Sequence, residues 1–234
     1  MAILAVASGK GGAGKTSLVV SLADYWSSRC GLKVAALDLD PNSNLLDWIG
    51  DAGMPNVTCI RVTEDTVFDA AIAANTEHDI VLIDVAGVLS QGMLFAVGAA
   101  DAVLIPANPS RPDIIEASRT NGVIDHVEKT ARKHNPTAVI PRAVVLNRSK
   151  RREVMTAKAR EFITAAELPL LDSDLADRVC FREAWLLHRA PLSMGDKDAV
   201  RDVETLAAEI SDRLGIGPKA AKKRSKRAKA TTEA

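Results

Sequence analysis

The sequence predicts a single α/β domain with a mostly parallel sheet and helices on both faces. Three observations predict this class. The chain has 234 residues, a length that one α/β domain can reach without splitting. Short apolar runs without alternation, typical of buried parallel strands, recur between helical patterns. The first of these runs leads directly into a glycine-rich segment that opens a helix, as in domains that bind ligands at the carboxyl ends of their strands.

The composition predicts a core of small side chains in a reducing compartment. Hydrophobic residues make up 47% of the chain and aromatic residues only 3%, so Ala, Val, Leu and Ile must fill the core. The 3 cysteines are scattered and show neither a disulfide framework nor metal-ligand spacing. No basic segment precedes an apolar run at the N-terminus, and no run approaches the length of a membrane span. We therefore expect a cytoplasmic protein.

The glycine-rich segment has the spacing of a phosphate-binding loop, Gly9, four residues, then Gly14-Lys15-Thr16. Its glycines allow a tight turn that brings backbone N–H groups to a polyphosphate, and the following helix offers its free N–H groups to the same anion. Lys15 can reach the terminal phosphates, and the Thr16 hydroxyl can bind Mg²⁺. An accidental glycine-rich turn is the alternative, but the flanking strand and helix favour the loop. The predicted nucleotide cradle is Lys10, Gly11, Gly12, Ala13, Gly14, Lys15, Thr16 and Ser17.

The first half of the chain alternates strands and helices. We expect strands at residues 2–7, 33–37, 57–62, 79–84 and 102–105, and helices at residues 15–29, 66–74 and 91–99, with Gly31 ending the first helix. Asp38 and Asp40 follow the second strand, and Asp84 ends the fourth, in the Walker B arrangement of a carboxylate that holds Mg²⁺ through water. Each alone could be a solvated turn or an ordinary strand end. The neighbouring phosphate loop favours a metal site.

The second half begins with a proline-punctuated loop at residues 106–113. A long helix should follow from Pro112, with Ile114, Ile115, Ile124 and Val127 facing inward. We expect a strand at residues 138–146 that ends at Asn147-Arg148, a short strand at 168–171 and helices at 177–188 and 197–214. The apolar stripe of the last helix indicates core packing: Val200, Val203, Leu206, Ile210 and Leu214.

Lys10 is a second lysine that an ordinary phosphate loop does not need. Residues 10–16, Lys-Gly-Gly-Ala-Gly-Lys-Thr, match the variant loop of the ParA/MinD family of ATPases at every fixed position, and the chain resembles this family in motif order across residues 3–148. The resemblance implies that Lys10 reaches the nucleotide of a dimer partner, that Asp40 orients the attacking water, and that Asn147 recognises adenine. Asp38 and Asp84 then belong to the Mg²⁺ site.

Two residues depart from the family pattern. Asn42 stands where the family usually has Gln, and Val85 stands where it commonly has Thr or Ser. The second departure bears on a hydroxyl contact to Mg²⁺ or water. No cysteine follows the 79–84 strand at a bridging position, which disfavours an iron–sulfur relative, and the 4 histidines show no ligand or triad spacing.

The net charge of zero hides an asymmetry. Residues 217–234 carry seven basic residues and one acid, while residues 1–216 carry 23 basic and 29 acidic residues, so the parts have charges of +6 and −6. We expect an ATPase domain at 1–216 and a disordered basic tail at 217–234. The tail has no large apolar side chain for membrane anchoring, which favours a polyanion such as DNA over stable membrane insertion. A solubilising extension is the alternative. The cluster Arg148, Lys150, Arg151 and Arg152 fits a DNA contact and a solvated helix end equally.

The resemblance implies a P-loop ATPase that uses Mg²⁺ and ATP. Its ATP-bound homodimer would bind DNA without sequence preference, and a ParB-like or other cargo-adaptor protein would stimulate hydrolysis. Its role would be to partition plasmids or chromosomes, or to position a protein body, on the nucleoid. A MinD-like switch that cycles on membranes and a metabolic ligase of the dethiobiotin-synthetase type remain as alternatives.

Overall fold

In the computed structural model, which describes residues 1–150 and 153–218, seven strands form one sheet in the order β3-β2-β4-β1-β5-β6-β7. Every neighbouring pair is parallel. The strands are β1 Ala2–Val6, β2 Val34–Asp38, β3 Val57–Arg61, β4 Ile80–Asp84, β5 Ala102–Ala107, β6 Arg142–Ser149 and β7 Leu170–Ala176. The predicted α/β class with a parallel sheet is confirmed.

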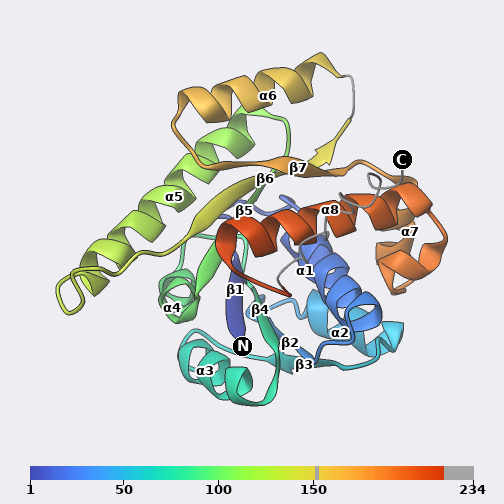
Figure 1. Ribbon diagram of the computed structural model, residues 1–234, viewed down its shortest axis with the longest axis horizontal. Helices are drawn as coiled ribbons and strands as arrows, with labels where there is room; N and C mark the ends of the chain where they lie inside the picture. Colours follow the sequence, from blue (N-terminus) through green and yellow to red (C-terminus); the bar gives the residue numbers. More distant parts are fainter. Residues whose placement is uncertain (151–152, 219–234) are drawn as a thin grey trace, which may run out of the picture.

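Helices cover both faces of the sheet (Figure 1). They are α1 Lys15–Asp24, α2 Asn44–Ala52, α3 Val67–Glu77, α4 Gln91–Ala99, α5 Arg111–Ala131, α6 Val154–Ala165, α7 Val179–Leu186 and α8 Lys197–Leu214, with short turns η1 Tyr25–Arg29 and η2 Pro191–Met194. One core cluster joins α1, α2, α7 and α8 to the sheet, and a second joins α3, α4, α5 and α6 to its other face. Small aliphatic side chains fill both, as the composition predicts.

The centre of the sheet positions the glycine-rich loop. β1 lies between β4 and β5, so the loop that follows it emerges in the middle of the carboxyl edge. Asp38 and Asp84 are register partners at the ends of the adjacent strands β2 and β4. Since ligands of open α/β sheets bind beyond the carboxyl ends of the strands, this topology gathers the predicted motifs at one edge.

Several predicted boundaries are corrected. The first helix changes at Tyr25 into the π-helical turn η1, and Gly31 follows it with φ 70°, its N–H donating to Ser27 O. The strand predicted at 138–146 begins only at Arg142, because Pro141 has no N–H for the ladder. β7 runs on to Ala176, beyond the predicted 168–171.

Two helix predictions are also corrected. α2 was not predicted, although Leu45, Trp48 and Ile49 have helical spacing and are buried. Ile115 was predicted to face inward but is 45% exposed, whereas Ile124 is buried. Adjacent residues of a helix lie about 100° apart, so Ile114 and Ile115 cannot both face the sheet.

The described chain ends just beyond α8. Ile216 is buried, and Gly217 lies so close to Trp26 that a Cβ would be 3.1 Å from its Nε1. The predicted tail falls mostly on residues 219–234, which lie outside the described residues, as do Arg151 and Arg152. Among the residues described, no helix combines the length and apolarity needed to cross a membrane.

Candidate functional site

The glycine-rich segment forms the loop between β1 and α1. Gly12 and Gly14 have φ values of 81° and 87°, left-handed conformations that glycine adopts without steric cost. Gly14 is constrained a second time, because a Cβ there would lie 1.9 Å from Nδ2 of Asn147. Lys15 Nζ donates to the carbonyl of Lys10 at 3.2 Å and so spans the loop. The glycine spacing read from the sequence thus matches what the backbone requires.

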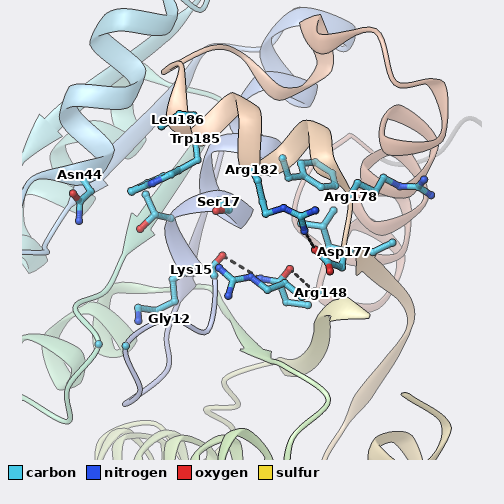
Figure 2. A pocket seen from close by; sticks show the side chains of 18 of the residues that line it. Gly12, Lys15, Ser17, Asn44, Arg148, Asp177, Arg178, Arg182, Trp185 and Leu186 are labelled. Carbon is cyan, nitrogen blue, oxygen red and sulfur yellow. Dashed lines mark hydrogen bonds and ion pairs between the residues drawn. The ribbon is translucent and has the colours of Figure 1, made fainter. Parts of the chain in front are cut away.

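A pocket of about 550 Å³ opens beside this loop. Figure 2 shows that its walls come from opposite sides, with Gly12 and Lys15 facing Arg182 and Trp185 of α7. Six of the eight predicted cradle residues line it: Gly11, Gly12, Gly14, Lys15, Thr16 and Ser17. Ala13 is instead buried beneath the loop, and Lys10 points away from the pocket toward α5. The remaining lining includes Asp40, Asn44, Gly87, Asn147, Arg148, Asp177, Arg178, Phe181 and Leu186.

Thr16 and Asp84 fit a magnesium site. The Thr16 hydroxyl donates to Asp84 Oδ2 at 2.6 Å, whereas the buried Oδ1 of Asp84 has no hydrogen-bond partner within the described chain. No group of three or more His, Cys, Asp or Glu that could hold a metal occurs in residues 1–150 and 153–218. One hydroxyl and one carboxylate oxygen are the kind of ligands that Mg²⁺ uses, since it is usually held by one or two carboxylates, substrate phosphates and water.

The site carries buried charge in both signs. Burial raises the pKa of Asp84 from 3.8 to about 7, against the lowering effects of the Thr16 hydrogen bond and the Lys15 charge. Burial also lowers the pKa of Lys15, although Asp84 and Asp40 oppose this shift. Both groups therefore lack full compensation for their lost hydration. A polyphosphate with a divalent cation would supply it, with anion to Lys15 and cation to Asp84.

Asp38 and Asp40 lie side by side at the end of β2 but make different contacts. Asp38 is fully buried, and its two oxygens accept from the backbone N–H groups of Asp40 at 3.1 Å and Leu46 at 3.0 Å. Burial raises its pKa. Asp40 lines the pocket and accepts from the backbone and side chain of Asn42, each at 2.9 Å. Asp38 thus shapes the loop that presents Asp40, and the sequence did not predict this bracing role.

Lys10 is held outside the pocket by the start of α5. Its Nζ lies 2.5 Å from Oδ2 of Asp113, and Ser110 Oγ donates to the same oxygen. Asn108 Nδ2 donates to the other oxygen of Asp113 at 3.0 Å. Although burial raises the pKa of Asp113, the bonds from Lys10 and Ser110 outweigh it and hold the pKa below its usual value. The Lys10 side chain remains 41% exposed, so its charge stays accessible.

Asn147 is buried under the loop. Its Nδ2 donates to the carbonyl oxygens of Ala13 at 2.9 Å and Gly14 at 3.3 Å, and its Oδ1 accepts from Arg148 N. It lines the pocket, so recognition of adenine by Asn147 remains a prediction, and its present contacts fix the loop to β6. Arg148 has φ 52°, an uncommon value for a side chain of this size, and lines the same wall.

Comparison with known proteins now decides the family. The sequence model of the family described as "CobQ/CobB/MinD/ParA nucleotide binding domain" matches residues 4–191, most of the chain. The chain belongs to this family. Its members' phosphate-loop fold is that of P-loop NTPases, in agreement with the loop, the carboxylates and the sheet described above.

Individual relatives agree with the family. The chain is 32% identical over 142 residues to "Protein ParA" of Rhizobium radiobacter, a match that covers 60% of this chain and 64% of that protein. It is 29% identical over 216 residues to "Maintenance of carboxysome distribution protein A" of Halothiobacillus neapolitanus, covering 88% and 95%. In fold it is similar to MinD of Pyrococcus horikoshii, solved with Mg-ADP, with TM-score 0.69 and 19% identity over 92% of this chain and 98% of that one.

The departure from the family pattern at Val85 has a simple structural outcome. Val85 is fully buried in the core cluster under α3 and α4, so its side chain does not enter the pocket. The next pocket-lining residue is Gly87, which touches the phosphate loop: a Cβ on it would lie 2.9 Å from the Cα and N of Gly11. The segment after β4 therefore contacts the loop through backbone rather than through a hydroxyl.

Sequence reasoning missed the contribution of α7. Arg182 pairs with Asp177, and Arg178 Nε donates to Asp202 Oδ2 at 2.7 Å. Trp185 packs edge-on against Trp48 of α2, with ring centroids 5.1 Å apart. The one available signal was position, because these residues follow the end of β7 at the carboxyl edge.

Proposed function

We propose that this member of the family is a ParA-type positioning ATPase. It binds Mg²⁺-ATP, closes into a dimer around the nucleotides, and binds DNA without sequence preference. Hydrolysis, stimulated by a ParB-like or other cargo-adaptor protein, resets it. The observation that carries the proposal is the placement of two loop lysines with separate tasks.

The two lysines face different directions. Lys15 lines the pocket and is buried, as a lysine that serves its own subunit's phosphates must be. Lys10 lies outside the pocket, half-exposed on the pair with Asp113. Within its own subunit the Lys10 ammonium pairs with Asp113 and does not reach the pocket. Reaching the nucleotide of a second subunit would give it a task at a nucleotide, and this supports nucleotide-dependent dimerisation.

The chain's own residues would divide the hydrolysis step between them. Bound Mg²⁺ would neutralise phosphate charge, held by Thr16 and, through water, by Asp84 and Asp38. Lys15 and the backbone N–H groups of Gly12 and Gly14 would hold the phosphates in place. Asp40, at the pocket edge, would orient the attacking water, and Asn147 would contact the adenine. Water is the acceptor we propose.

The relatives and the charge distribution support cargo positioning. One relative is named Protein ParA, and another is named for the maintenance of carboxysome distribution, which is the placement of a large body. The chain combines an acidic body with a basic C-terminal segment, +6 over residues 217–234, that can neutralise DNA phosphates. We place the active form on the nucleoid for this reason.

Co-sedimentation separates this proposal from its alternatives. The full chain, with Mg²⁺ and a non-hydrolysable ATP analogue, should pellet with DNA-coated beads of unrelated sequences and not with liposomes of anionic lipid. ADP should release it. Binding to liposomes but not to DNA would favour the MinD-like membrane cycle instead. Rapid turnover only when a carboxylic acid substrate is added would favour the ligase.

A further inference from the structure

Helix α4 has an outer face without a cover. It reads Gln-Gly-Met-Leu-Phe-Ala-Val-Gly-Ala and carries no charged side chain. Met93, Ala96 and Val97 are buried against the sheet, but Leu94 and Phe95 point outward and are 38% and 36% exposed. A helix that is apolar on every side is ordinarily buried on every side. Within the part of the chain that the structure describes, nothing buries the outer side of α4.

The apolar surface continues onto the neighbouring helix α3. Helices α3 and α4 lie side by side (Figure 1), and a phenylalanine ring of α3, Phe68, is 4.0 Å from the position of a Cβ on Gly98 of α4. Ile72, one turn after Phe68 on α3, is also exposed. We call the following exposed side chains the α3–α4 face: Phe68, Ile72, Leu94 and Phe95. Exposed large apolar side chains gathered on two packed helices favour an interaction site.

The segment that carries the α3–α4 face has charge of one sign. Between Arg61 and Arg111 the sequence contains seven acids and no lysine or arginine. Glu64 and Asp65, just before α3, and Asp69, in its first turn, are exposed. None of the three has an ion pair with any described residue. An apolar surface with an unpaired acidic border is complementary to an apolar surface with a basic border.

The α3–α4 face is connected to the nucleotide pocket through side-chain contacts of α4. The N-cap of α4 is Ser90, six residues after Asp84 at the end of β4, and its Oγ accepts from Met93 N at 3.3 Å. In the first turn of α4, a Cβ on Gly92 would lie 2.9 Å from Glu64 Cγ and 3.3 Å from Leu39 Cδ2. Leu39 stands between Asp38 and Asp40. A partner that presses on α4 therefore acts on the segments that carry Asp40 and Gly87.

We propose that the α3–α4 face is the docking surface for a basic amphipathic helix of a partner protein. Its apolar side covers Leu94, Phe95 and Phe68, and its lysines or arginines pair with the acids at the start of α3. The docking stands on its own, while the claim that the docked helix changes ATP hydrolysis rests on the proposed function. The chain's own residues 219–234 have the matching charge, but they comprise only Lys, Arg, Ala, Ser, Thr and Glu and cannot cover large apolar side chains.

The test uses two labelled synthetic helices and the full chain. One peptide carries leucines on one side and lysines on the other, and its twin has glutamate at every lysine. Fluorescence anisotropy should show the basic peptide binding more tightly than the acidic twin. In the variant Glu64→Lys/Asp69→Lys the basic peptide should lose about ten-fold in affinity, since two attractions become repulsions. The acidic twin should gain affinity for the same variant. The matched control, Glu161→Lys/Asp212→Lys, changes the same charge elsewhere and should leave the preference unchanged.

A second pair of variants tests the apolar part. Phe95→Ala should lower the affinity for the basic peptide several-fold. Phe162 is an exposed phenylalanine of α6, and Phe162→Ala should leave this affinity unchanged. Equal loss in the control variants, or equal binding of both peptides, would overturn the proposal. So would sedimentation that shows the face buried by self-association, or basic-peptide binding that appears only after residues 219–234 are removed. Titration of ATP in the same samples keeps the outcomes separate: peptide binding without ATP binding would refute the proposed function and leave the docking surface standing.

Discussion

Buried ionisable residues show how this chain prepares a site for a charged ligand. Asp84 is 1% exposed and has one oxygen without a partner among the described residues, and Lys15 is 7% exposed and bonded only to a carbonyl. Each charge loses hydration on folding, which disfavours the ionised form and shifts its pKa toward neutrality. The folded protein thus retains an unfavourable free energy of charge desolvation, which bound phosphate and Mg²⁺ would reduce.

Asp84→Asn should stabilise the nucleotide-free protein at alkaline pH. The pKa of Asp84 is raised to about 7, so the folded state binds this proton more tightly than the unfolded state, and the stability contributed by Asp84 falls as the pH rises from about 4 to about 7. Asparagine keeps an oxygen for Thr16 but has no proton to lose. The free energy of unfolding of the variant should therefore exceed that of the wild type by about 2 to 4 kcal/mol at pH 8 and by little at pH 4.

Urea unfolding at both pH values, in EDTA and without nucleotide, measures this difference. Wild-type and variant curves separated equally at pH 4 and pH 8 would show that Asp84 does not titrate in this range. Binding of Mg²⁺-ATP, by contrast, should weaken in the variant, because the neutral amide lacks the negative charge that attracts the cation.

At the scale of elements, the segment after β4 meets the phosphate loop through two glycines. Gly87 approaches the backbone of Gly11 so closely that no side chain fits between them. Asn108 Nδ2 adds a bond to Gly12 O at 3.3 Å from the other side, so the loop is bordered by two separate segments.

Gly87→Ala should impair nucleotide binding while leaving the fold intact. The added methyl group would lie 2.9 Å from backbone atoms of Gly11, which cannot move away as a flexible side chain could. We expect ATP affinity to fall about ten-fold or more, measured by calorimetry, because the loop must open to accept the methyl group. The control is Gly122→Ala in α5, where nothing lies within 4 Å of the new Cβ and alanine should stabilise the helix by about 0.5 to 1 kcal/mol. Normal affinity in the Gly87 variant would show that this contact yields without cost.

Elements with strong local signals were predictable, and those formed by distant contacts were not. α8 begins and ends where its apolar stripe predicts, and Val203, Leu206, Ile210 and Leu214 are buried. The polar middle of β7 has no such signal. The N–H groups of Asp172 and Ser173 are satisfied by the Glu209 side chain at 2.8 Å and 2.7 Å, a partner 37 and 36 residues away.

At the scale of the whole molecule, the candidate site joins strand ends that only the sheet order brings together. The loop after β1 and the acids after β2 and β4 could be placed from motif order, since parallel strands share a carboxyl edge. The bond between Lys10 and Asp113 spans 103 residues and has no sequence signal of its own. The α7 wall of the pocket also has no sequence signal of its own, because its position depends on how the last third of the chain packs against the loop after β1.

Removal of residues 219–234 should weaken DNA binding without altering ATP turnover. The truncation takes away the seven basic residues of the tail and leaves a net acidic body. If three or four of them contact phosphates, the slope of log affinity against log salt should flatten by about three units, at roughly 0.9 per contact. ATP turnover without DNA should stay the same. The last residue in sequence that lines the pocket is Leu186, well before residues 219–234. Salt titrations by anisotropy with both proteins in ATP measure the slopes, and identical slopes would place DNA binding on the folded body.

The central claim, that Lys10 serves a second subunit, is tested most directly by light scattering of three lysine variants with a non-hydrolysable ATP analogue. Lys10→Ala should bind the analogue with nearly normal affinity by calorimetry and remain monomeric, because its ammonium lies outside its own pocket. Lys15→Ala should lose binding and dimer together, since it removes the charge that pairs with the phosphates. Lys129→Ala, an exposed lysine of α5, should dimerise like the wild type. A Lys10→Ala protein that forms the full dimer with the analogue would contradict the account.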